Sequence, residues 1–359
     1  MRIHLTVAVS PAFLDAGQTR FFKDLLMKAI GMYKILIGIC LEVILASALV
    51  LTAGCAKETQ YKIGLTQFAT HPAADASRQG FKDALKAGGF QEGKNVLYDY
   101  QNPEGDAALE QTIAGKFIND RVNLIFSFGT RPSQQCVKAA KGTNIPVVFC
   151  GVTDPVAAGL VSSMSNHPNE NVTGTSDMIE VGSSVNLILQ IVPEIKKLGT
   201  IYNTGETNSR VLNDQLKVAC SLKGITLVER TVSTAVEVRT AGESLVGQVD
   251  AVWIGSDNTV VSGLEALIKV CEDNKIPFFP PDDPLIKMGG IACLGFDYHD
   301  IGYQSGEMAV NILKGTRASD IPAERGKKFS YTVNTRAAER YGVTIPQEIL
   351  DKALTKYME

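Results

Sequence analysis

The sequence has few of the features that mark an enzyme, a metal site or a nucleic-acid-binding protein. It has 4 histidines and 7 cysteines in 359 residues, with no CxxC pair and no Cys/His cluster, which argues against a zinc site. It has no nucleophile elbow, no P-loop and no dinucleotide-binding glycine motif. The net charge of -3 and the lack of a long Lys or Arg run argue against an extended nucleic-acid surface. We therefore expect no catalytic residues, no cofactor, no metal and no nucleic-acid partner.

Length and composition favour two α/β lobes. The chain has 359 residues, of which 45% are apolar and 20% are charged. This length is too great for one ordinary core and suits two lobes of about 100–150 residues each.

Residues 27–55 have the layout of an export signal. Lys28 and Lys34 form a short basic start, residues 35–51 are almost wholly apolar, and small residues lead to Cys55. This order is typical of a secretory signal peptide, and a transmembrane anchor that is never cleaved is the alternative. Both interpretations place the rest of the chain outside the cytoplasm.

The end of this segment, LTAGC at residues 51–55, resembles a bacterial lipobox. In a lipobox the cysteine sulfur is acylated and the peptide before it is removed, which anchors the protein to the membrane. We therefore expect lipidation at Cys55. The expected amino-terminal segments are a start-site artefact at residues 1–26, a lipoprotein signal peptide at 27–54 and a linker at 55–60.

From residue 61 onward, strand-like and helix-like stretches alternate. Apolar runs suited to buried strands cover residues 61–68, 96–100, 122–128 and 145–152. Apolar residues at helical spacing cover residues 74–87, 106–120 and 133–140. Strands that alternate with single helices predict a parallel sheet covered on both faces.

The same cycle starts again in the second half of the chain. Strands are expected at 198–202, 226–231, 249–254, 277–279 and 291–296, and helices at 181–191, 209–222, 235–245, 260–274 and 298–314. Residues 171–178 join the halves and residues 321–326 return, before a strand at 329–333 and helices after Thr335 and Pro346. We predict two doubly wound parallel-sheet lobes joined by a multi-strand hinge, with ligands bound at the carboxyl ends of the strands.

Polar residues follow most of the expected strands and are the candidate ligand contacts. They are Gln67, His71, Thr130, Ser133, Thr153 and Asp154 in the first half, and Asn203, Asn208, Ser209, Asp257, Asn258 and Asp297 in the second. Ser, Thr, Asp and Asn at such turns are also ordinary helix caps, and both interpretations stay open. Helix N-termini that face a cleft favour a carboxylate, and Asp257 or Asp297 would suit an ammonium group. Together they predict a pocket for a zwitterion.

Seven short motifs occur in order between residues 61 and 346. They are Gln67 with His71-Pro72, Gly129-Thr130 with Ser133, Val152-Thr153-Asp154-Pro155-Val156, Gly174-Thr175-Ser176-Asp177, Tyr202-Asn203 with Glu206, Asn208 and Ser209, Ser256-Asp257-Asn258-Thr259-Val260, and Gly295-Phe296-Asp297-Tyr298. Together they resemble the ABC transporter substrate-binding protein family whose members include tryptophan- and tyrosine-binding lipoproteins. In the third-strand turn, Arg131 stands between Thr130 and Pro132, where this family would have Thr-Pro. That departure is compatible with a more acidic ligand.

The resemblance implies a type I periplasmic-binding fold that closes on a small molecule and delivers it to an ABC permease in the membrane. The implied lobes are residues 61–177 with 298–324, and residues 178–297 with 325–359. An aromatic amino acid is the favoured ligand. The alternatives are another small solute, such as a nucleoside, sugar or peptide, and a ligand sensor that signals to a membrane partner.

Two rival classes fit the sequence less well. In an enzyme, His71 could serve as a base, but the histidines are scattered and no nucleophile accompanies them. A transcriptional repressor with the same two-lobed fold would need an amino-terminal helix-turn-helix and no export signal. The sequence has the reverse arrangement.

Overall fold

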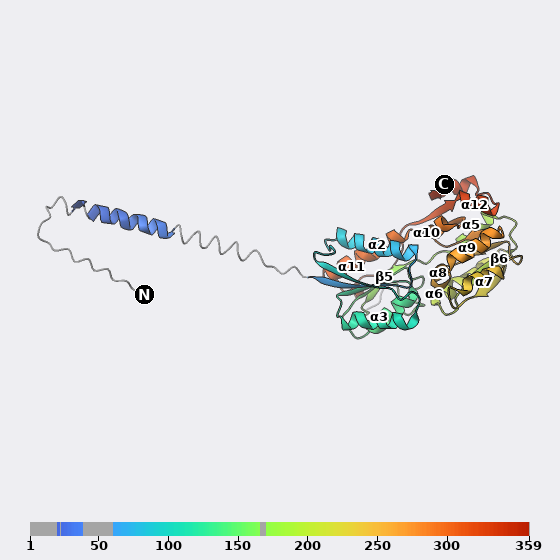
Figure 1. Cartoon of the computed structure of the whole chain (residues 1–359), viewed down its shortest axis with the longest axis horizontal. Coiled ribbons are helices and arrows are strands. Elements are labelled where there is room, and N and C mark those ends of the chain that lie inside the picture. The colour runs from blue at the N-terminus through green and yellow to red at the C-terminus, as the bar shows by residue number, and fades with distance from the viewer. Residues whose placement is uncertain (1–19, 22, 39–59, 166–169, 359) are drawn as a thin grey trace. The chain divides into compact units, whose positions relative to one another are not determined.

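The computed structural model describes residues 20–21, 23–38, 60–165 and 170–358. The described residues before 39 are helical, and residues Gln60–Glu359 form a compact unit of their own (Figure 1). No helix within the described ranges is both long enough and apolar enough to cross a membrane. Cys55, the expected lipidation site, and residues 39–54 of the expected signal peptide lie outside the described residues.

A six-stranded parallel sheet forms the first lobe. Its order is β11-β5-β4-β3-β1-β2. Its strands are β1 (Tyr61–Gln67), β2 (Val96–Gln101), β3 (Leu124–Phe128), β4 (Val147–Cys150), β5 (Val172–Ser176) and β11 (Glu324–Arg325). Its helices are α2 (Pro72–Ala87), α3 (Ala107–Asn119), α4 (Thr130–Ala140) and α11 (Tyr298–Leu313). Figure 1 shows α2 and α11 on one face of this sheet and α3 on the other.

Helices α2 and α11 pack against each other without intervening side chains at two glycines. A Cβ on Gly80 would lie 2.0 Å from the His299 carbonyl oxygen, and a Cβ on Gly302 would lie 1.9 Å from the Ser77 carbonyl oxygen. Only glycine allows so close an approach of two backbones. This contact holds α11, which comes late in the chain, in the first lobe.

The second lobe contains a four-stranded parallel sheet and a smaller mixed sheet. The parallel sheet has the order β7-β6-β8-β9, with β6 (Lys197–Tyr202), β7 (Thr226–Thr231), β8 (Ala251–Trp253) and β9 (Phe278–Phe279). The mixed sheet has the order β10-β12-β13, with β10 (Ala292–Phe296), β12 (Phe329–Asn334) and β13 (Ala353–Tyr357). The helices are α5 (Val181–Ile191), α6 (Thr207–Leu222), α7 (Glu237–Glu243), α8 (Asn258–Ser262), α9 (Leu264–Asp273), α10 (Asp283–Met288), α12 (Thr335–Tyr341) and α13 (Gln347–Lys352), and a short 3-10 turn covers Ala318–Asp320.

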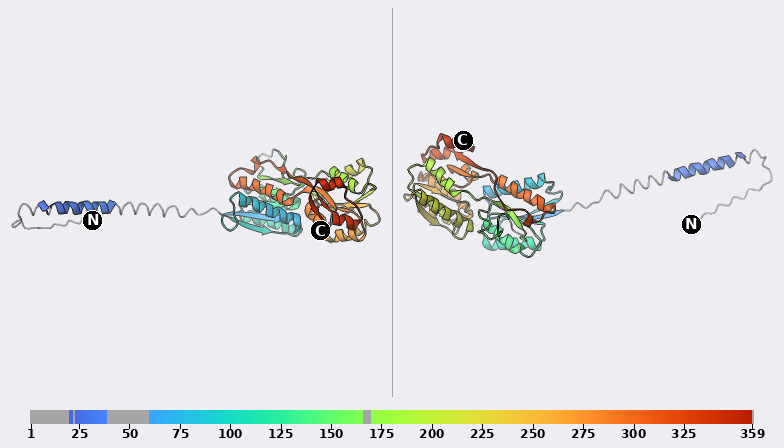
Figure 2. Two further views of the ribbon diagram at one scale, coloured as in Figure 1. Left: turned by 90° about the horizontal axis from the view of Figure 1, so that it is seen from above. Right: turned by 180° about the vertical axis from the view of Figure 1, so that it is seen from behind.

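The two parallel sheets share one topology. In each sheet the first strand in the chain lies between the second and third strands, so the order β2-β1-β3-β4 corresponds to β7-β6-β8-β9. The connection after the first strand runs to one side of the sheet, and the connection after the third strand runs to the opposite side. Ligands of doubly wound sheets bind where this direction reverses, between the first and third strands. The views in Figure 2 show helices along both sides of the sheets, and the alternating α/β pattern predicted from the sequence is confirmed.

The second half departs from the sequence prediction in four places. Residues 291–296, expected as another parallel strand, form β10 and pair antiparallel with β12. The helix expected at 260–274 is interrupted at Gly263, where a Cβ would lie 2.5 Å from the Ala235 carbonyl oxygen. Helix α10 and strand β13 were not expected, because segments this short carry little periodic signal.

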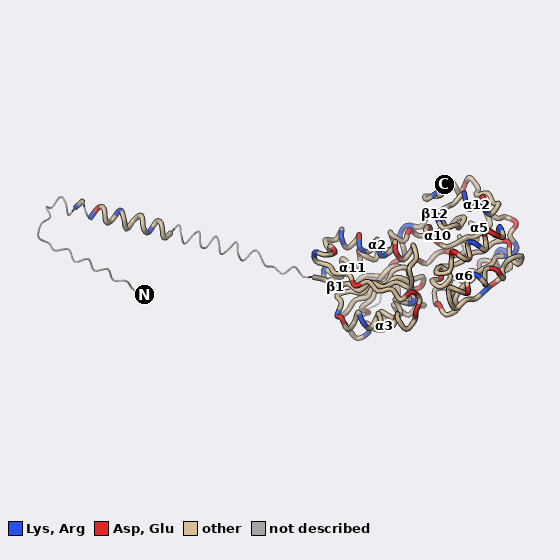
Figure 3. Tube along the Cα trace, viewed as in Figure 1, with Lys and Arg blue, Asp and Glu red and all other residues tan. Residues whose placement is uncertain are grey.

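The described surface carries charges of both signs. Lys and Arg alternate with Asp and Glu along both lobes in Figure 3. Many form ion pairs one helical turn apart, such as Arg239 with Glu243 and Lys352 with Glu348.

Candidate functional site

A small cavity lies between the two lobes, at the carboxyl ends of the parallel strands. The first lobe contributes His71, Ala73, Phe128, Thr130, Gly151 and Thr153 to its lining. The second lobe contributes Asn208, Ser256, Asp257, Asn258, Val261 and Asp282. Asp177 and Tyr298, which lie where the chain crosses between the lobes, complete the lining. The cavity therefore lies where the topology of both sheets predicts a ligand site.

Three rings form one wall of this cavity. Phe128 contacts His71 edge to face, with ring centroids 5.6 Å apart, and contacts Tyr298 in the same manner at 5.7 Å. Such edge-to-face pairs are a favourable aromatic geometry. A ligand ring would therefore meet a preformed aromatic surface.

His71 is held in the neutral form. His71 is the N-cap of α2, and its side chain makes the cap bond, in which the Ala74 N–H donates to Nδ1 at 3.4 Å. Burial lowers the pKa of His71 to about 4, against smaller opposing effects of Asp75 and Glu104. At neutral pH the imidazole is therefore uncharged.

The Asp177 carboxylate is buried and hydrogen bonded to groups from two other segments. The Tyr298 hydroxyl donates to its Oδ2 atom at 2.6 Å, and the Thr153 hydroxyl donates to its Oδ1 atom at 3.1 Å. Burial raises the pKa of Asp177, and these two hydrogen bonds oppose the rise.

Asp257 is both a helix cap and a lining residue. Its Oδ1 atom accepts from the Val260 N–H at 2.8 Å at the start of α8, and its Oδ2 atom accepts from the Asn203 N–H at 2.6 Å. Burial, followed by repulsion from Glu206, raises the pKa of Asp257 to about 7. The sequence left capping and cavity lining as alternatives, and the structure shows that one carboxylate does both.

Asp282 is a third buried carboxylate in the lining. It caps α10 by accepting from the Leu285 N–H at 3.2 Å. Burial raises the pKa of Asp282 to about 7. Three carboxylates and a neutral histidine give the cavity an acidic character, which suits a ligand that carries an ammonium group.

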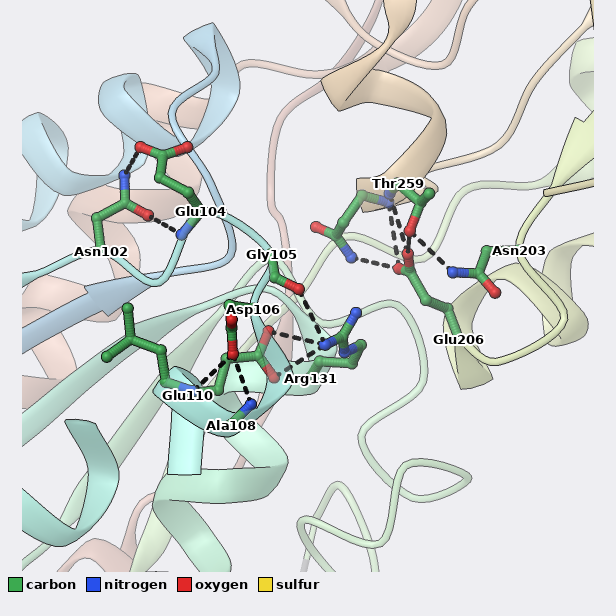
Figure 4. Close-up of polar contacts among 12 residues, drawn as sticks. Asn102, Glu104, Gly105, Asp106, Ala108, Glu110, Arg131, Asn203, Glu206 and Thr259 are labelled. Carbon is green, nitrogen blue, oxygen red and sulfur yellow. Dashed lines mark hydrogen bonds and ion pairs between the residues drawn. The ribbon is translucent and has the colours of Figure 1, made fainter. Parts of the chain in front are cut away.

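Glu206 organises the second-lobe side of the cavity (Figure 4). Its Oε1 atom accepts from the Thr259 N–H at 3.0 Å and the Thr259 hydroxyl at 2.7 Å. Its Oε2 atom accepts from the Asn258 N–H at 3.2 Å and side-chain amide at 2.6 Å. These bonds fix the start of α8, and with it Asp257 and Asn258.

Six of the twelve predicted ligand contacts line the cavity. They are His71, Thr130, Thr153, Asn208, Asp257 and Asn258. Two more, Asn203 and Ser209, lie behind Asp257. The backbone of Asn203 and the hydroxyl of Ser209 both hydrogen bond to that carboxylate.

The remaining four predicted contacts are used locally, and the structure does not place them in the lining. Gln67 donates to the Ala69 carbonyl oxygen, and the Ser133 hydroxyl lies 2.7 Å from the Gly129 carbonyl oxygen in its own helix. Asp154 caps the turn at residues 156–157, and Asp297 is the exposed cap of α11. At these four positions capping or local bonding accounts for the side chain.

Three residues with ionisable side chains line the cavity but were not among the contacts predicted from the sequence. Asp177 and Tyr298 stood within recognised motifs, and Asp282 stood in no motif. An Asp-Asp-Pro run before α10 was the available signal for Asp282, because Asp followed by Pro is typical of a helix start.

Arg131 does not reach the lining of the cavity. Its guanidinium forms a 3.3 Å ion pair with the buried Glu110 carboxylate and lies 3.4 Å from the Gly105 carbonyl oxygen (Figure 4). It also stacks over the Phe68 ring. Burial raises the pKa of Glu110 to about 7, which the Arg131 charge opposes. The idea that Arg131 admits a more acidic ligand is therefore not supported by its position.

Across the described ranges, no group of three or more His, Cys, Asp or Glu side chains is arranged to hold a metal ion. All five cysteines in these ranges, Cys136, Cys150, Cys220, Cys271 and Cys293, are buried and free.

The chain matches known proteins over most of its length. Residues 62–356 match the family model described as ABC transporter substrate binding protein. A protein named tyrosine-binding protein from Clostridioides difficile is 38% identical over 263 residues, which are 73% of this chain and 75% of that protein.

Two solved structures are also similar. A domain from Streptococcus pneumonia in complex with L-Trp has a TM-score of 0.79 at 30% identity, over 83% of this chain and 100% of the other. A ligand-free, open substrate-binding protein from Clostridium difficile has a TM-score of 0.63 at 37% identity over the same shares. The higher score at the lower identity indicates that the lobes described here lie closer to the arrangement in the L-Trp complex.

Proposed function

The chain belongs to the ABC transporter substrate-binding protein family, and we propose that it captures an aromatic amino acid in the cavity between its lobes. As a member of this family it is an extracytoplasmic binding protein rather than an enzyme, and its membrane partner is an ABC permease.

The observation that carries the choice of ligand is the pairing of a ring wall with buried carboxylates. His71, Phe128 and Tyr298 offer apolar ring surface on one side. Asp257 and Asp282 offer negative charge in a site largely withdrawn from water, where it strongly favours an ammonium group. The relatives named for tyrosine binding and for an L-Trp complex support the same ligand class.

Calorimetry on the protein from residue 60 onward tests this proposal. L-Tryptophan, L-tyrosine and L-phenylalanine should bind, and leucine, myo-inositol and ribose should bind at least about tenfold more weakly. A bound ligand at one hundred times its Kd should add about 2.7 kcal/mol to the free energy of unfolding. Tight binding of a sugar with no response to any aromatic amino acid would refute the proposal.

We further propose that the protein is anchored by a lipid on Cys55 after removal of a signal peptide at residues 27–54. The support is the order of basic, apolar and small residues that ends at this cysteine. Intact mass of the protein extracted from membranes should equal residues 55–359 plus the acyl groups. A mass that includes residues 27–54 would indicate an uncleaved anchor.

We also assign residues 61–177 with 298–324 to one lobe and residues 178–297 with 325–359 to the other. Sheet membership supports this division except at Arg325, which belongs to β11 and pairs with Ser176 of β5 in the first sheet, while β12 pairs with β10 in the second lobe. The crossings at these boundaries would act as the hinge that opens and closes the cavity. Small-angle scattering with and without L-tryptophan should show compaction on binding.

A further inference from the structure

Two buried polar atoms on side chains that line the cavity have no hydrogen-bond partner. They are Nε2 of His71, in the first lobe, and Oδ1 of Asn208, in the second. The two residues are only 9% and 2% exposed. A buried polar atom without a partner costs free energy, and natural structures rarely leave one without a reason.

The contacts of His71 determine which proton it carries. Its Nδ1 atom accepts from the Ala74 N–H, so this nitrogen must be unprotonated. In the neutral ring the proton is then on Nε2. The unpartnered atom is therefore a hydrogen-bond donor.

The contacts of Asn208 determine the orientation of its amide. Its Nδ2 atom donates to the Ser256 carbonyl oxygen at 2.7 Å, to Glu206 Oε2 at 3.2 Å and to Ser209 Oγ at 3.3 Å. Exchange of the two amide atoms would place oxygen against a carbonyl and a carboxylate. The unpartnered atom is therefore a hydrogen-bond acceptor.

Location in the cavity distinguishes these two atoms from other unpartnered ones. Among the described residues, Glu110 Oε1, Asn213 Oδ1 and Tyr341 Oη also lack a hydrogen bond, and none of these side chains lines the cavity. Glu110 has the Arg131 charge beside it. Asn213, on the same helix as Asn208, therefore provides a matched control.

We propose that His71 Nε2–H and Asn208 Oδ1 form a specificity pair that requires one ligand to present an oxygen acceptor to the first lobe and an N–H donor to the second. The donor belongs at Asn208 because this residue binds the backbone of Ser256, next to the Asp257 carboxylate. The inference rests on the proposed function and specifies which chemical groups of the ligand the cavity recognises. An α-amino acid satisfies both atoms at once and thereby bridges the lobes.

The oxygen acceptor has two possible sources in an aromatic amino acid. One is the α-carboxylate, which every amino acid carries, and the other is the ring hydroxyl of tyrosine. Both satisfy a neutral N–H donor, and different analogues remove each of them. Tryptamine lacks the carboxylate, phenylalanine lacks the ring hydroxyl, and indole-3-propionate lacks the amine.

The test measures Kd for these analogues in the wild type and in His71→Asn and Asn208→Ser. Asn retains a capping oxygen for the start of α2 but cannot place an N–H where Nε2 lies. If the acceptor is the α-carboxylate, we expect His71→Asn to abolish the preference for L-tryptophan over tryptamine. If the acceptor is the ring hydroxyl, we expect it to abolish the preference for L-tyrosine over L-phenylalanine. We expect Asn208→Ser to reduce, but not abolish, the preference for L-tryptophan over indole-3-propionate, because the Asp257 and Asp282 carboxylates still favour the amine. Each preference should be about tenfold or more in the wild type, as one hydrogen bond to a charged group provides.

Because each readout is a ratio of two ligands, a general loss of packing or stability cancels. His299→Asn, which changes a histidine that pairs with Asp83 outside the cavity, and Asn213→Ser should keep every ratio. His71→Gln and Asn208→Thr replace the first variants if thermal unfolding shows that either fails to fold. Wild-type ratios in both cavity variants would overturn the inference while leaving the proposed function intact. Failure of the wild type to bind any aromatic amino acid would overturn both.

Discussion

The Tyr298 hydroxyl donates a 2.6 Å hydrogen bond to the Asp177 carboxylate, and this bond joins two segments where the chain crosses between the lobes. Asp177 directly follows β5 of the first sheet, and Tyr298 begins α11 after β10 of the second lobe. Both side chains line the cavity. Side chains that line the cavity and segments that cross between the lobes therefore share one buried hydrogen bond.

Tyr298→Phe should lower the free energy of unfolding by about 1–3 kcal/mol, because it leaves a buried carboxylate with one hydrogen bond fewer. The ring packing against Phe128 is retained. Urea denaturation at neutral pH measures the loss. Tyr303→Phe, on the same helix but outside the cavity, should have little effect. Equal stabilities for the two variants would show that the Asp177 bond contributes nothing.

The ligand-free protein should lose stability as the pH rises from about 4 to about 7. Asp257 and Asp282 have pKa values raised from 3.8 to about 7, so in this window the folded state binds more protons than the unfolded state. The free energy of unfolding should then fall by up to about 1.4 kcal/mol per pH unit for each group. Glu110, whose pKa is also raised to about 7, adds to the fall. His71, whose pKa is lowered from 6.5 to about 4, opposes it between these two values, and Asp99, whose pKa is lowered, opposes it only near and below its ordinary range.

Urea denaturation across this pH range measures the slope, and Asp282→Asn should reduce it. Asp257→Asn is a less clean variant, because its side-chain NH2 would meet the Asn203 N–H that now donates to Asp257. Ligand affinity should change in the other direction and rise with pH, because an ammonium group binds the ionised carboxylates. Stability and affinity that both rise with pH would contradict this account of the carboxylates.

Arg131→Met should destabilise the protein by about 1–3 kcal/mol at pH 7 and by less at lower pH. The substitution leaves the buried Glu110 carboxylate without its ion pair, and protonation of Glu110, whose pKa is about 7, relieves the cost. In the Glu110→Gln background the same substitution should cost much less. A double-mutant cycle measured at two pH values gives the coupling. Coupling that is independent of pH would argue against a charge-based role.

Gly129→Ala should weaken ligand binding more than its effect on the backbone explains. Gly129 has φ +90, and a Cβ there would lie 3.2 Å from Asn258 Oδ1 in the other lobe. Gly142 has φ +78 in the same lobe with nothing within 4 Å, so Gly142→Ala places a side chain at a positive φ without the interlobe contact. Gly142→Ala should lose about 1–2 kcal/mol of stability, and Gly129→Ala should lose more, because φ +90 with ψ 159 is a conformation essentially confined to glycine. Only Gly129→Ala should also raise the Kd for L-tryptophan, as calorimetry would show.

The sequence by itself determined the α/β alternation and the edge of each sheet where the cavity lies. Buried strands are continuous apolar runs and their helices have a 3.6-residue period, so both can be read from local pattern. Parallel strands bring their carboxyl ends to one edge, which is why Thr130, Thr153 and Asp257 could be placed near one another. The Cys55 interpretation also came from local pattern, and it stays a prediction.

Only the tertiary structure decided which polar side chains face the cavity. A cap such as Asp154 or Asp297 has the same local sequence as Asp257, and it differs only in what lies across from it. Asp282 and Tyr298 reach the cavity because short elements and chain crossings fold back between the lobes. Such placements depend on contacts between residues far apart in the chain, and no local period or capping signal records them.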